Sequence, residues 1–348
     1  MPSSKDDGTA AAAGQIGSLS LGELAERKDD EPEPNGAENG TQKMCSACEK
    51  KSDVAKKCTA CKCVWYCDKD CQNKHWKEHK KECKWIKKVL DERGGKLDVG
   101  TEKDIAPLGN VPPSEECPIC MHAFPHHEML KGYYACCGKT VCGGCNFQHW
   151  TKSGKTCPYC RTTIPKSGEK ELVRMRKRAE RKDPDAMRNM SECYRVGHYG
   201  LPVDQTKCID FLRQSAALGC LAAQYQLGIF HENGAMGLEQ DRKEALKYYT
   251  NAAEGGHVFS RHNVGSYEDK KRNYVAAMRH WRLSASGGMR ASMGALISCF
   301  KQGILHHTDL SETVQSFYRA RAEIWTKDRV EHIAYLKRIG EYKAEYES

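Results

Sequence analysis

The sequence predicts a multidomain protein in which two small zinc-stabilised modules are followed by an all-α helical-repeat solenoid. Two observations support this fold class. Of the 20 cysteines in 348 residues, eight lie within residues 45–83 and eight within 117–160, mostly as closely spaced pairs. From about residue 167 the cysteines become sparse, and short boxes of small residues ending in glycine recur at intervals typical of stacked helix pairs.

Changes in composition divide the chain into seven segments. The N-terminal segment is rich in Ala, Gly, Ser and acidic residues and has almost nothing to bury, so we expect it to be disordered. The predicted order is a disordered segment at 1–43, a first zinc module at 44–84, a linker at 85–113, a second zinc module at 114–166, a basic helical linker at 167–182, helical repeats at 183–307 and a C-terminal helical cap at 308–348.

Paired cysteines form either disulfides or metal sites. The N-terminus has no apolar signal-peptide core, and no stretch approaches the roughly 18 apolar residues of a membrane span. The sequence therefore predicts a reduced, intracellular protein, cytoplasmic or nuclear, with no membrane partner. The formal charge is +9, but fifteen zinc-bound thiolates and four zinc ions would lower it to about +2, which does not favour nucleic acid as a partner.

The first module contains four pairs of candidate zinc ligands, enough for two tetrahedral sites. The last pair lies four residues apart on one face of a predicted helix. The pairs are Cys45 and Cys48, Cys58 and Cys61, Cys67 and Cys71, and His79 and Cys83.

These ligands, with WYCDKDCQ at 65–72 and Trp76, resemble the MYND zinc finger. The resemblance implies that the pairs interleave, so that Cys45, Cys48, Cys67 and Cys71 hold one ion and Cys58, Cys61, His79 and Cys83 the other. It also implies a docking surface for short proline-containing peptides. His75 and Cys63 are further candidates nearby; the family spacing favours His79 over His75 and leaves Cys63 as a spare thiol.

The cysteines of the second module resemble those of an all-cysteine RING-type zinc finger. The resemblance implies one ion held by Cys117, Cys120, Cys142 and Cys145 and another held by Cys136, Cys137, Cys157 and Cys160, about four zinc ions in all. The usual histidine is missing, and the middle pair consists of two adjacent residues. Adjacent cysteines need a bent backbone, which Gly138 can provide; otherwise His126, His127 or His149 would replace Cys136.

A RING-type module often recruits a ubiquitin-conjugating enzyme through a shallow apolar groove. If this one is a ligase, the resemblance implies that Ile119, Trp150, Pro158 and Arg161 contact that enzyme. A guanidinium with five donors suits the bridging role of an arginine there. The alternative is that Ile119 and Trp150 belong to a small core and that Arg161 is an ordinary surface residue.

The repeats are predicted from two short sequence patterns that recur along the chain. The first pattern, AALG, AAEG and SASG, ends in Gly219, Gly255 and Gly287, which are 36 and 32 residues apart. The other occurs at 190–197, 227–234 and 296–303, and the two together resemble Sel-one-like repeats, which are helix pairs related to the tetratricopeptide repeat. The resemblance implies a stacked surface that binds a protein ligand, and a plain helical bundle is the alternative. Asp309 and Glu312 form a capping-box pattern that predicts the start of a further helix.

The chain has no nucleophile elbow, dinucleotide fingerprint or metalloprotease helix. Zinc sites with four protein ligands leave no open position for catalysis, so no catalytic residue is assigned. The sequence predicts a zinc-binding scaffold or adaptor for protein–protein interaction. The alternative is a RING-type ubiquitin-protein ligase whose repeats and MYND-like finger recruit the substrate, and the residues leave open whether the protein is an enzyme.

Overall fold

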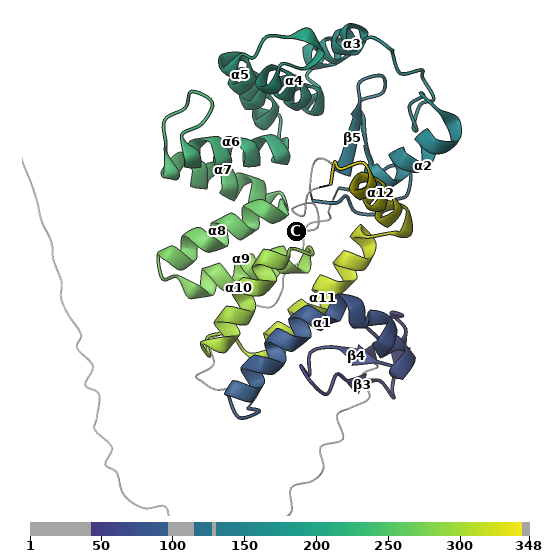
Figure 1. Cartoon of the computed structure of the whole chain (residues 1–348). Coiled ribbons are helices and arrows are strands. Elements are labelled where there is room, and N and C mark those ends of the chain that lie inside the picture. Colours follow the sequence, from purple (N-terminus) through teal and green to yellow (C-terminus); the bar gives the residue numbers. More distant parts are fainter. Residues whose placement is uncertain (1–42, 97–114, 127–129, 343–348) are drawn as a thin grey trace, which may run out of the picture. The chain divides into compact units, whose positions relative to one another are not determined.

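The computed structural model describes residues 43–96, 115–126 and 130–342 (Figure 1). The predicted disordered segment, apart from Lys43, and most of the predicted linker lie outside these residues, as does His127. The first module consists of two small antiparallel sheets and one long helix: β1 (Lys43–Met44) pairs with β2 (Lys51–Ser52), β3 (Lys56–Lys57) pairs with β4 (Trp65–Tyr66), and α1 spans Lys69–Glu92.

Helix α1 carries zinc-ligand candidates and core residues on one face. Asp68 caps its start by accepting a hydrogen bond from the backbone N–H of Cys71 at 2.7 Å. The buried positions of α1 follow helical spacing, so the ligands in its first half share a face with the apolar residues in its second half. The buried residues are Cys71, His79, Glu82, Cys83, Ile86, Val89 and Leu90. One continuous helix therefore leads out of the module and takes its apolar end into the core of the repeats.

The second module is a hairpin followed by a helix. Strands β5 (Lys131–Tyr134) and β6 (Lys139–Cys142) are antiparallel, with Lys131 opposite Cys142 and Tyr134 opposite Lys139. Helix α2 (Gly143–Ser153) follows β6 directly, and the sulfur of Cys142 accepts a hydrogen bond from the N–H of Cys145. Ligand candidates thus lie at the end of a strand and in the first turn of a helix.

The rest of the chain is helical, and Figure 1 shows helices α4 to α9 following one another as stacked antiparallel pairs, whereas α12 lies beside α2. The solenoid predicted from the boxes is therefore present. The elements are α3 (Gly168–Glu180), α4 (Pro184–Val196), the short 3-10 helix η2 (His198–Gly200), α5 (Gln205–Ala217), α6 (Leu221–Asn233), α7 (Arg242–Glu254), α8 (Val258–Lys270), α9 (Tyr274–Ser286), α10 (Arg290–Lys301), α11 (His307–Ile324) and α12 (Lys327–Arg338).

At the first turn between helix pairs the turning glycine is the one read in the sequence, Gly219, whereas at the next two turns it lies one position later. Gly219, Gly256 and Gly288 have φ of +88°, +99° and +94°, the left-handed conformation that ends a helix with least strain in glycine. Gly255 instead permits close packing, because a Cβ there would lie 2.4 Å from a methyl carbon of Leu221. The equivalent turns are therefore 37 and 32 residues apart.

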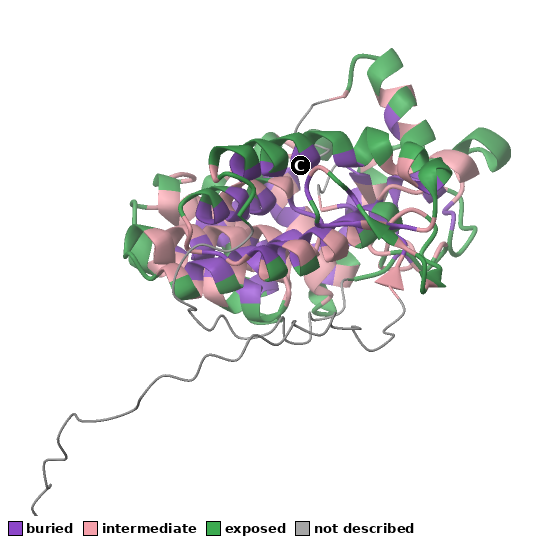
Figure 2. Ribbon diagram, turned by 90° about the horizontal axis from the view of Figure 1, so that it is seen from below, coloured by how far each residue is buried: buried purple, intermediate pink, exposed green. Residues whose placement is uncertain are grey.

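Both zinc modules pack against the helical region. One continuous core joins Ile86 and Leu90 of α1 to Leu296 of α10 and Phe317 of α11. Buried residues are gathered between the helices while the outer faces are exposed (Figure 2). Among the described residues, no helix has the length and apolar character needed to cross a membrane.

Candidate metal centres and binding surfaces

Sixteen side chains converge in four groups, each with its four ligand atoms within 4.8 Å of one another. The groups are Cys45, Cys48, Cys67 and Cys71; Cys58, Cys61, His79 and Cys83; Cys117, Cys120, Cys142 and Cys145; and Cys136, Cys137, Cys157 and Cys160. These are the interleaved sets implied by the two zinc-finger resemblances. We number them zinc groups 1 to 4 in this order.

The spacing of the sulfurs suits zinc. A tetrahedron with Zn–S bonds of about 2.3 Å places the sulfurs about 3.8 Å apart. Four sulfur pairs lie at this distance: 3.9 Å for Cys67–Cys71, 3.8 Å for Cys58–Cys83, 3.9 Å for Cys120–Cys142 and 3.8 Å for Cys137–Cys157. Two other pairs are closer, at 3.3 Å for Cys48–Cys67 and 3.4 Å for Cys136–Cys160. All twenty cysteines are unpaired thiols. Each group has four protein ligands, so the arrangement suits structural zinc with no open coordination position.

The histidine of zinc group 2 is His79. Its Nε2 lies 3.3 Å from Sγ of Cys61. His75 lies outside the group, because its Nδ1 pairs with the hydroxyl of Tyr66 at 2.9 Å. Cys63 also lies outside the group; it is fully buried and its sulfur is 3.4 Å from Nε2 of His307.

Zinc group 4 contains the two adjacent cysteines. The backbone bends at Gly138, which has φ of +70° and donates its N–H to the carbonyl of Tyr134 at 2.8 Å. His149 is not in the group, because its ring nitrogens pair with Thr156 at 2.8 Å and with Arg161 at 2.9 Å. The chain reversal thus brings Cys136 and Cys137 to one site without a histidine.

His126 joins the second module to the repeats instead of binding metal. Its Nε2 lies 2.6 Å from the carbonyl oxygen of Gly287, and its ring meets Phe259 edge to face with centroids 6.0 Å apart. Burial lowers the pKa of His126 to about 4, so the imidazole is neutral at pH 7 and donates Nε2–H to the carbonyl. Nothing in the sequence distinguished this histidine from a zinc ligand.

The four residues expected to contact a conjugating enzyme differ in how far their side chains are exposed. Ile119 and Trp150 are 41% and 52% exposed, which excludes them from a buried core, and Arg161 is also exposed. Pro158 is buried, whereas the neighbouring Tyr159, which the sequence did not single out, is 46% exposed. The exposed apolar set of this module also includes Met121, at 67%.

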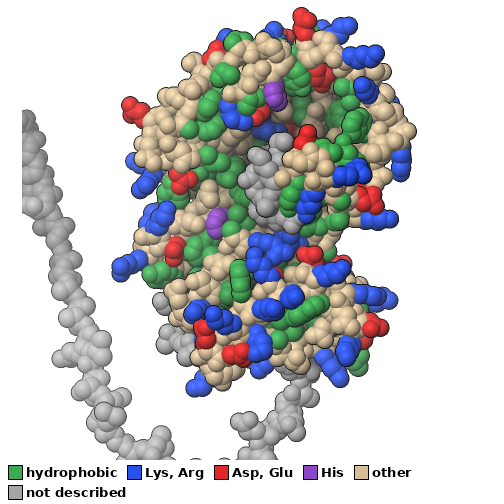
Figure 3. Space-filling model, in the orientation of Figure 1, with side chains coloured by type: hydrophobic (Ala, Val, Ile, Leu, Met, Phe, Trp, Pro, Cys, Tyr) green, Lys and Arg blue, Asp and Glu red, His purple; other side chains and the backbone are tan. Residues whose placement is uncertain are grey.

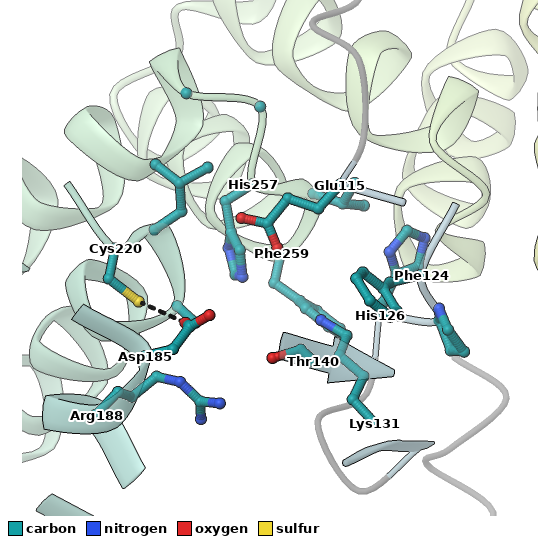
Figure 4. A pocket seen from close by; sticks show the side chains of 16 residues that line it. Glu115, Phe124, His126, Lys131, Thr140, Asp185, Arg188, Cys220, His257 and Phe259 are labelled. Carbon is teal, nitrogen blue, oxygen red and sulfur yellow. Dashed lines mark hydrogen bonds between the residues drawn. The ribbon is translucent and has the colours of Figure 1, made fainter. Parts of the chain in front are cut away.

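A hollow lies between the second module and the repeats. Figure 4 shows Phe124, His126 and Lys131 of the module facing His257 and Phe259 of the repeats. This hollow continues into a cavity of about 770 Å³. The hairpin contributes Tyr133 to the lining of this cavity. Helix α4 contributes Asn189 and Glu192 from one of its faces, and helix α6 contributes Tyr225, Gln226 and Ile229 from one of its faces.

The positive charge is concentrated in the first module. Residues 43–96 include 16 basic and 8 acidic residues, a formal charge of +8. Seven zinc-bound thiolates and two zinc ions would leave about +5. Figure 3 shows lysine and arginine side chains prominent on the part of the surface that carries α1. These cations offset the negative charge of the thiolate groups.

Two known families match four segments of the chain. Residues 45–83 match the MYND finger, and residues 184–220, 221–257 and 260–289 each match the Sel1 repeat. The chain therefore contains a zinc-binding MYND finger and Sel1 repeats, both of which are protein-interaction modules. The three repeat matches coincide with the helix pairs α4–α5, α6–α7 and α8–α9.

Two curated proteins are similar to this chain over short regions. A histone-lysine N-methyltransferase of Arabidopsis thaliana is 40% identical over 53 residues, which are 15% of this chain and 11% of that protein. A zinc finger MYND domain-containing protein of Drosophila melanogaster is 44% identical over 48 residues, 14% of this chain and 10% of that protein. The chain thus spans about a tenth of the length of these curated relatives.

Two solved structures resemble the repeats. A Sel1 repeat protein of Oxalobacter formigenes has 25% sequence identity and a TM-score of 0.36, covering 37% of this chain and 98% of its own. A protective antigen of uropathogenic Escherichia coli with an SLR fold has 21% identity and a TM-score of 0.40, covering 58% of this chain and 42% of its own.

Proposed function

We propose that the protein is an adaptor whose MYND finger and Sel1 repeats bind segments of different proteins at the same time. The observation that carries this proposal is the combination of closed zinc groups with open binding surfaces. Four ligands close each metal group, whereas the cavity of about 770 Å³ beside α4 and α6 and an exposed tryptophan on α1 remain accessible. Metals in such sites stabilise structure, and the exposed surfaces supply the function.

The MYND finger is proposed to bind a proline-containing peptide at Trp76. This side chain is 38% exposed and lies beside His79, with ring centroids 6.3 Å apart. A large aromatic surface on a zinc-fixed helix loses little conformational entropy when it binds an apolar peptide. Trp85 is equally large and 44% exposed, but nine residues along α1 place it on the opposite face.

Replacing Trp76 with alanine is expected to weaken peptide binding by at least ten-fold, because an aromatic anchor contributes roughly 2 kcal/mol or more. Fluorescence anisotropy of the full chain with a library of labelled proline-containing peptides would measure this. Trp85→Ala is the matched control and should bind like the wild type. Equal loss in both variants, or no binding peptide in the library, would contradict a peptide site at Trp76.

The second module favours a second candidate function, a RING-type ubiquitin-protein ligase. The supporting observation is that Ile119, Trp150 and Tyr159 are exposed apolar side chains around the two zinc groups of one module, with Arg161 exposed beside them. Arg161 has φ of +64°, and its guanidinium lies 2.9 Å from Nδ1 of His149, which is on α2. Exposed apolar side chains and an exposed guanidinium in one zinc-binding module suit a bound conjugating enzyme.

If the module is a ligase, Ile119→Ala and Arg161→Ala are each expected to slow discharge of ubiquitin from a charged conjugating enzyme by at least ten-fold. Ile119 would lose its apolar contact and Arg161 its hydrogen bonds. Discharge assays with a panel of conjugating enzymes would measure this. Val275→Ala on α9, where the side chain is also 41% exposed, should behave like the wild type. No acceleration by wild-type protein holding four zinc ions would leave the adaptor function alone.

A further inference from the structure

Helix α11 lies along the loop that carries Cys58 and Cys61 of zinc group 2. Four of its polar side chains are spaced by four, four and three residues and so share one helical face; they are His307, Ser311, Gln315 and Tyr318. Nε2 of His307 donates to the carbonyl of Cys61 at 3.0 Å. Ser311 and Gln315 both donate to the carbonyl of Cys63, at 2.9 and 3.1 Å. This face of α11 therefore fixes the backbone of the ligand loop.

Tyr318 extends the same contact to the metal-binding histidine. Nε2 of His79 faces the sulfurs of its group, and Nδ1 lies 3.3 Å from the hydroxyl of Tyr318. That hydroxyl donates to Oε2 of Glu82 at 2.9 Å. When Nε2 binds zinc, the proton is on Nδ1 and is donated to the Tyr318 oxygen, which fixes the ring orientation. Nη1 of Arg290 lies 2.6 Å from Oε1 of Glu82 and compensates its buried charge.

The next helix, α12, makes a corresponding contact with zinc group 3. Arg329 is 2% exposed, and its Nη2 lies 3.7 Å from Sγ of Cys120 and 3.3 Å from the carbonyl of His122. Its Nη1 donates to the carbonyls of Ala123 and Ile324, at 2.5 and 2.7 Å. The guanidinium therefore holds the loop that carries Cys120 and places positive charge beside its thiolate.

Two glycines between ligands of zinc group 3 allow this approach. A Cβ on Gly144 would lie 2.8 Å from the backbone nitrogen of Arg329, and one on Gly143 would lie 2.4 Å from Nδ1 of His332. Both glycines occupy the first turn of α2, where a residue with a side chain would keep α12 away. The sequence Cys142-Gly-Gly-Cys145 thus fits both the metal group and the docked helix.

We propose that α11 and α12 supply the outer hydrogen bonds of one zinc site in each module, with Tyr318 positioning His79 in zinc group 2 and Arg329 positioning Cys120 in zinc group 3. Hydrogen bonds to metal ligands orient them and raise metal affinity. The two helices are consecutive, so the same C-terminal segment controls zinc retention in both modules. This role is independent of the partner-binding surfaces described above.

The test measures zinc release from the full-length, zinc-loaded chain after a chelator is added. Time-resolved alkylation of cysteines, read by mass spectrometry, assigns the release to individual groups. Tyr318→Phe is expected to accelerate alkylation of Cys58, Cys61 and Cys83 about ten-fold, the lower range for lost outer-sphere bonds. Arg329→Met is expected to accelerate zinc group 3 and not zinc group 2.

Matched controls lie in the repeats. Tyr249→Phe removes a buried hydroxyl that donates to Glu232 at 2.7 Å, and Arg261→Met removes a buried arginine of α8; both should release zinc like the wild type. Unchanged release in Tyr318→Phe and Arg329→Met would overturn the proposal. Equal acceleration at all four groups would also overturn it, because that result indicates general destabilisation instead of site-specific positioning.

Discussion

Exhaustive removal of zinc is expected to unfold both cysteine-rich modules and to leave the middle of the Sel1 solenoid folded. The modules contain strands of two to four residues; the core of the second is made largely of its ligand cysteines, and residues 45–83 of the first likewise bury mainly cysteines. Structural zinc supplies on the order of 10–16 kcal/mol of apparent binding free energy in small finger peptides, more than such cores can replace. Without the metal, the clustered thiolates of each group would take up protons, because their negative charges repel one another.

The repeats have cores that do not depend on zinc. Leu212 and Leu227 belong to one buried cluster, and Tyr249 and Val264 to another, and neither cluster includes a residue of the two zinc modules. Hydrogen exchange read by mass spectrometry should therefore show lost protection in residues 45–83 and 117–160 and retained protection in α5 to α8. Helices α10 and α11 should show intermediate loss, because they share a core with α1. Unchanged protection in a sample shown to be metal-free would exclude zinc as the stabilising element.

Replacing Arg282 with alanine is expected to destabilise the junction of the repeats and the C-terminal helices by about 3 kcal/mol. Arg282 on α9 is 1% exposed, and its guanidinium lies 2.8 Å from Oδ1 of Asp309 and 3.2 Å from Oε2 of Glu312, both on α11. Removing it leaves the largely buried Asp309 carboxylate without its partner and creates a cavity. Glu312 is 65% exposed on its side chain and contributes little to this loss.

Chemical denaturation of zinc-loaded protein, followed by intrinsic fluorescence, would measure the change. Lys247→Ala is the control, because it breaks an ion pair with Glu244 at 3.2 Å in which the lysine side chain is 67% exposed. That loss should not exceed about 0.5 kcal/mol. Adding Asp309→Asn to Arg282→Ala should restore part of the stability. A loss in Arg282→Ala no larger than in Lys247→Ala would show that the buried ion pair does not hold α9 to α11.

The helix predicted from the capping-box pattern is present, but Asp309 does not cap it, and the Arg282 contacts explain why. Helix α11 begins at His307, and His306 is the residue that precedes it, so Asp309 already lies in the first turn. Its carboxylate pairs with Arg282 across to α9 instead of capping its own helix. A capping pattern and an interhelical ion pair use the same residue types, and only packing distinguishes them.

The sequence by itself determined the metal groups and the repeated helix pairs. Both are encoded locally: a Cys-x-x-Cys turn brings two sulfurs together whatever surrounds it, and a period of 32 to 37 residues reflects one helix pair per repeat. It also determined that His79 and Cys83 share a helical face, because four residues make about one turn. These features need no knowledge of distant parts of the chain.

The tertiary structure alone decided which distant residues support those groups. Tyr318 contacts His79 across 239 residues, Arg329 contacts Cys120 across 209, and His126 contacts Gly287 across 161. In the sequence each is an ordinary aromatic or basic residue of a helix or loop. The physical reason is that such contacts depend on how separate elements dock, which is set by side-chain fit and burial over the whole core and leaves no periodic or spacing signal along the chain.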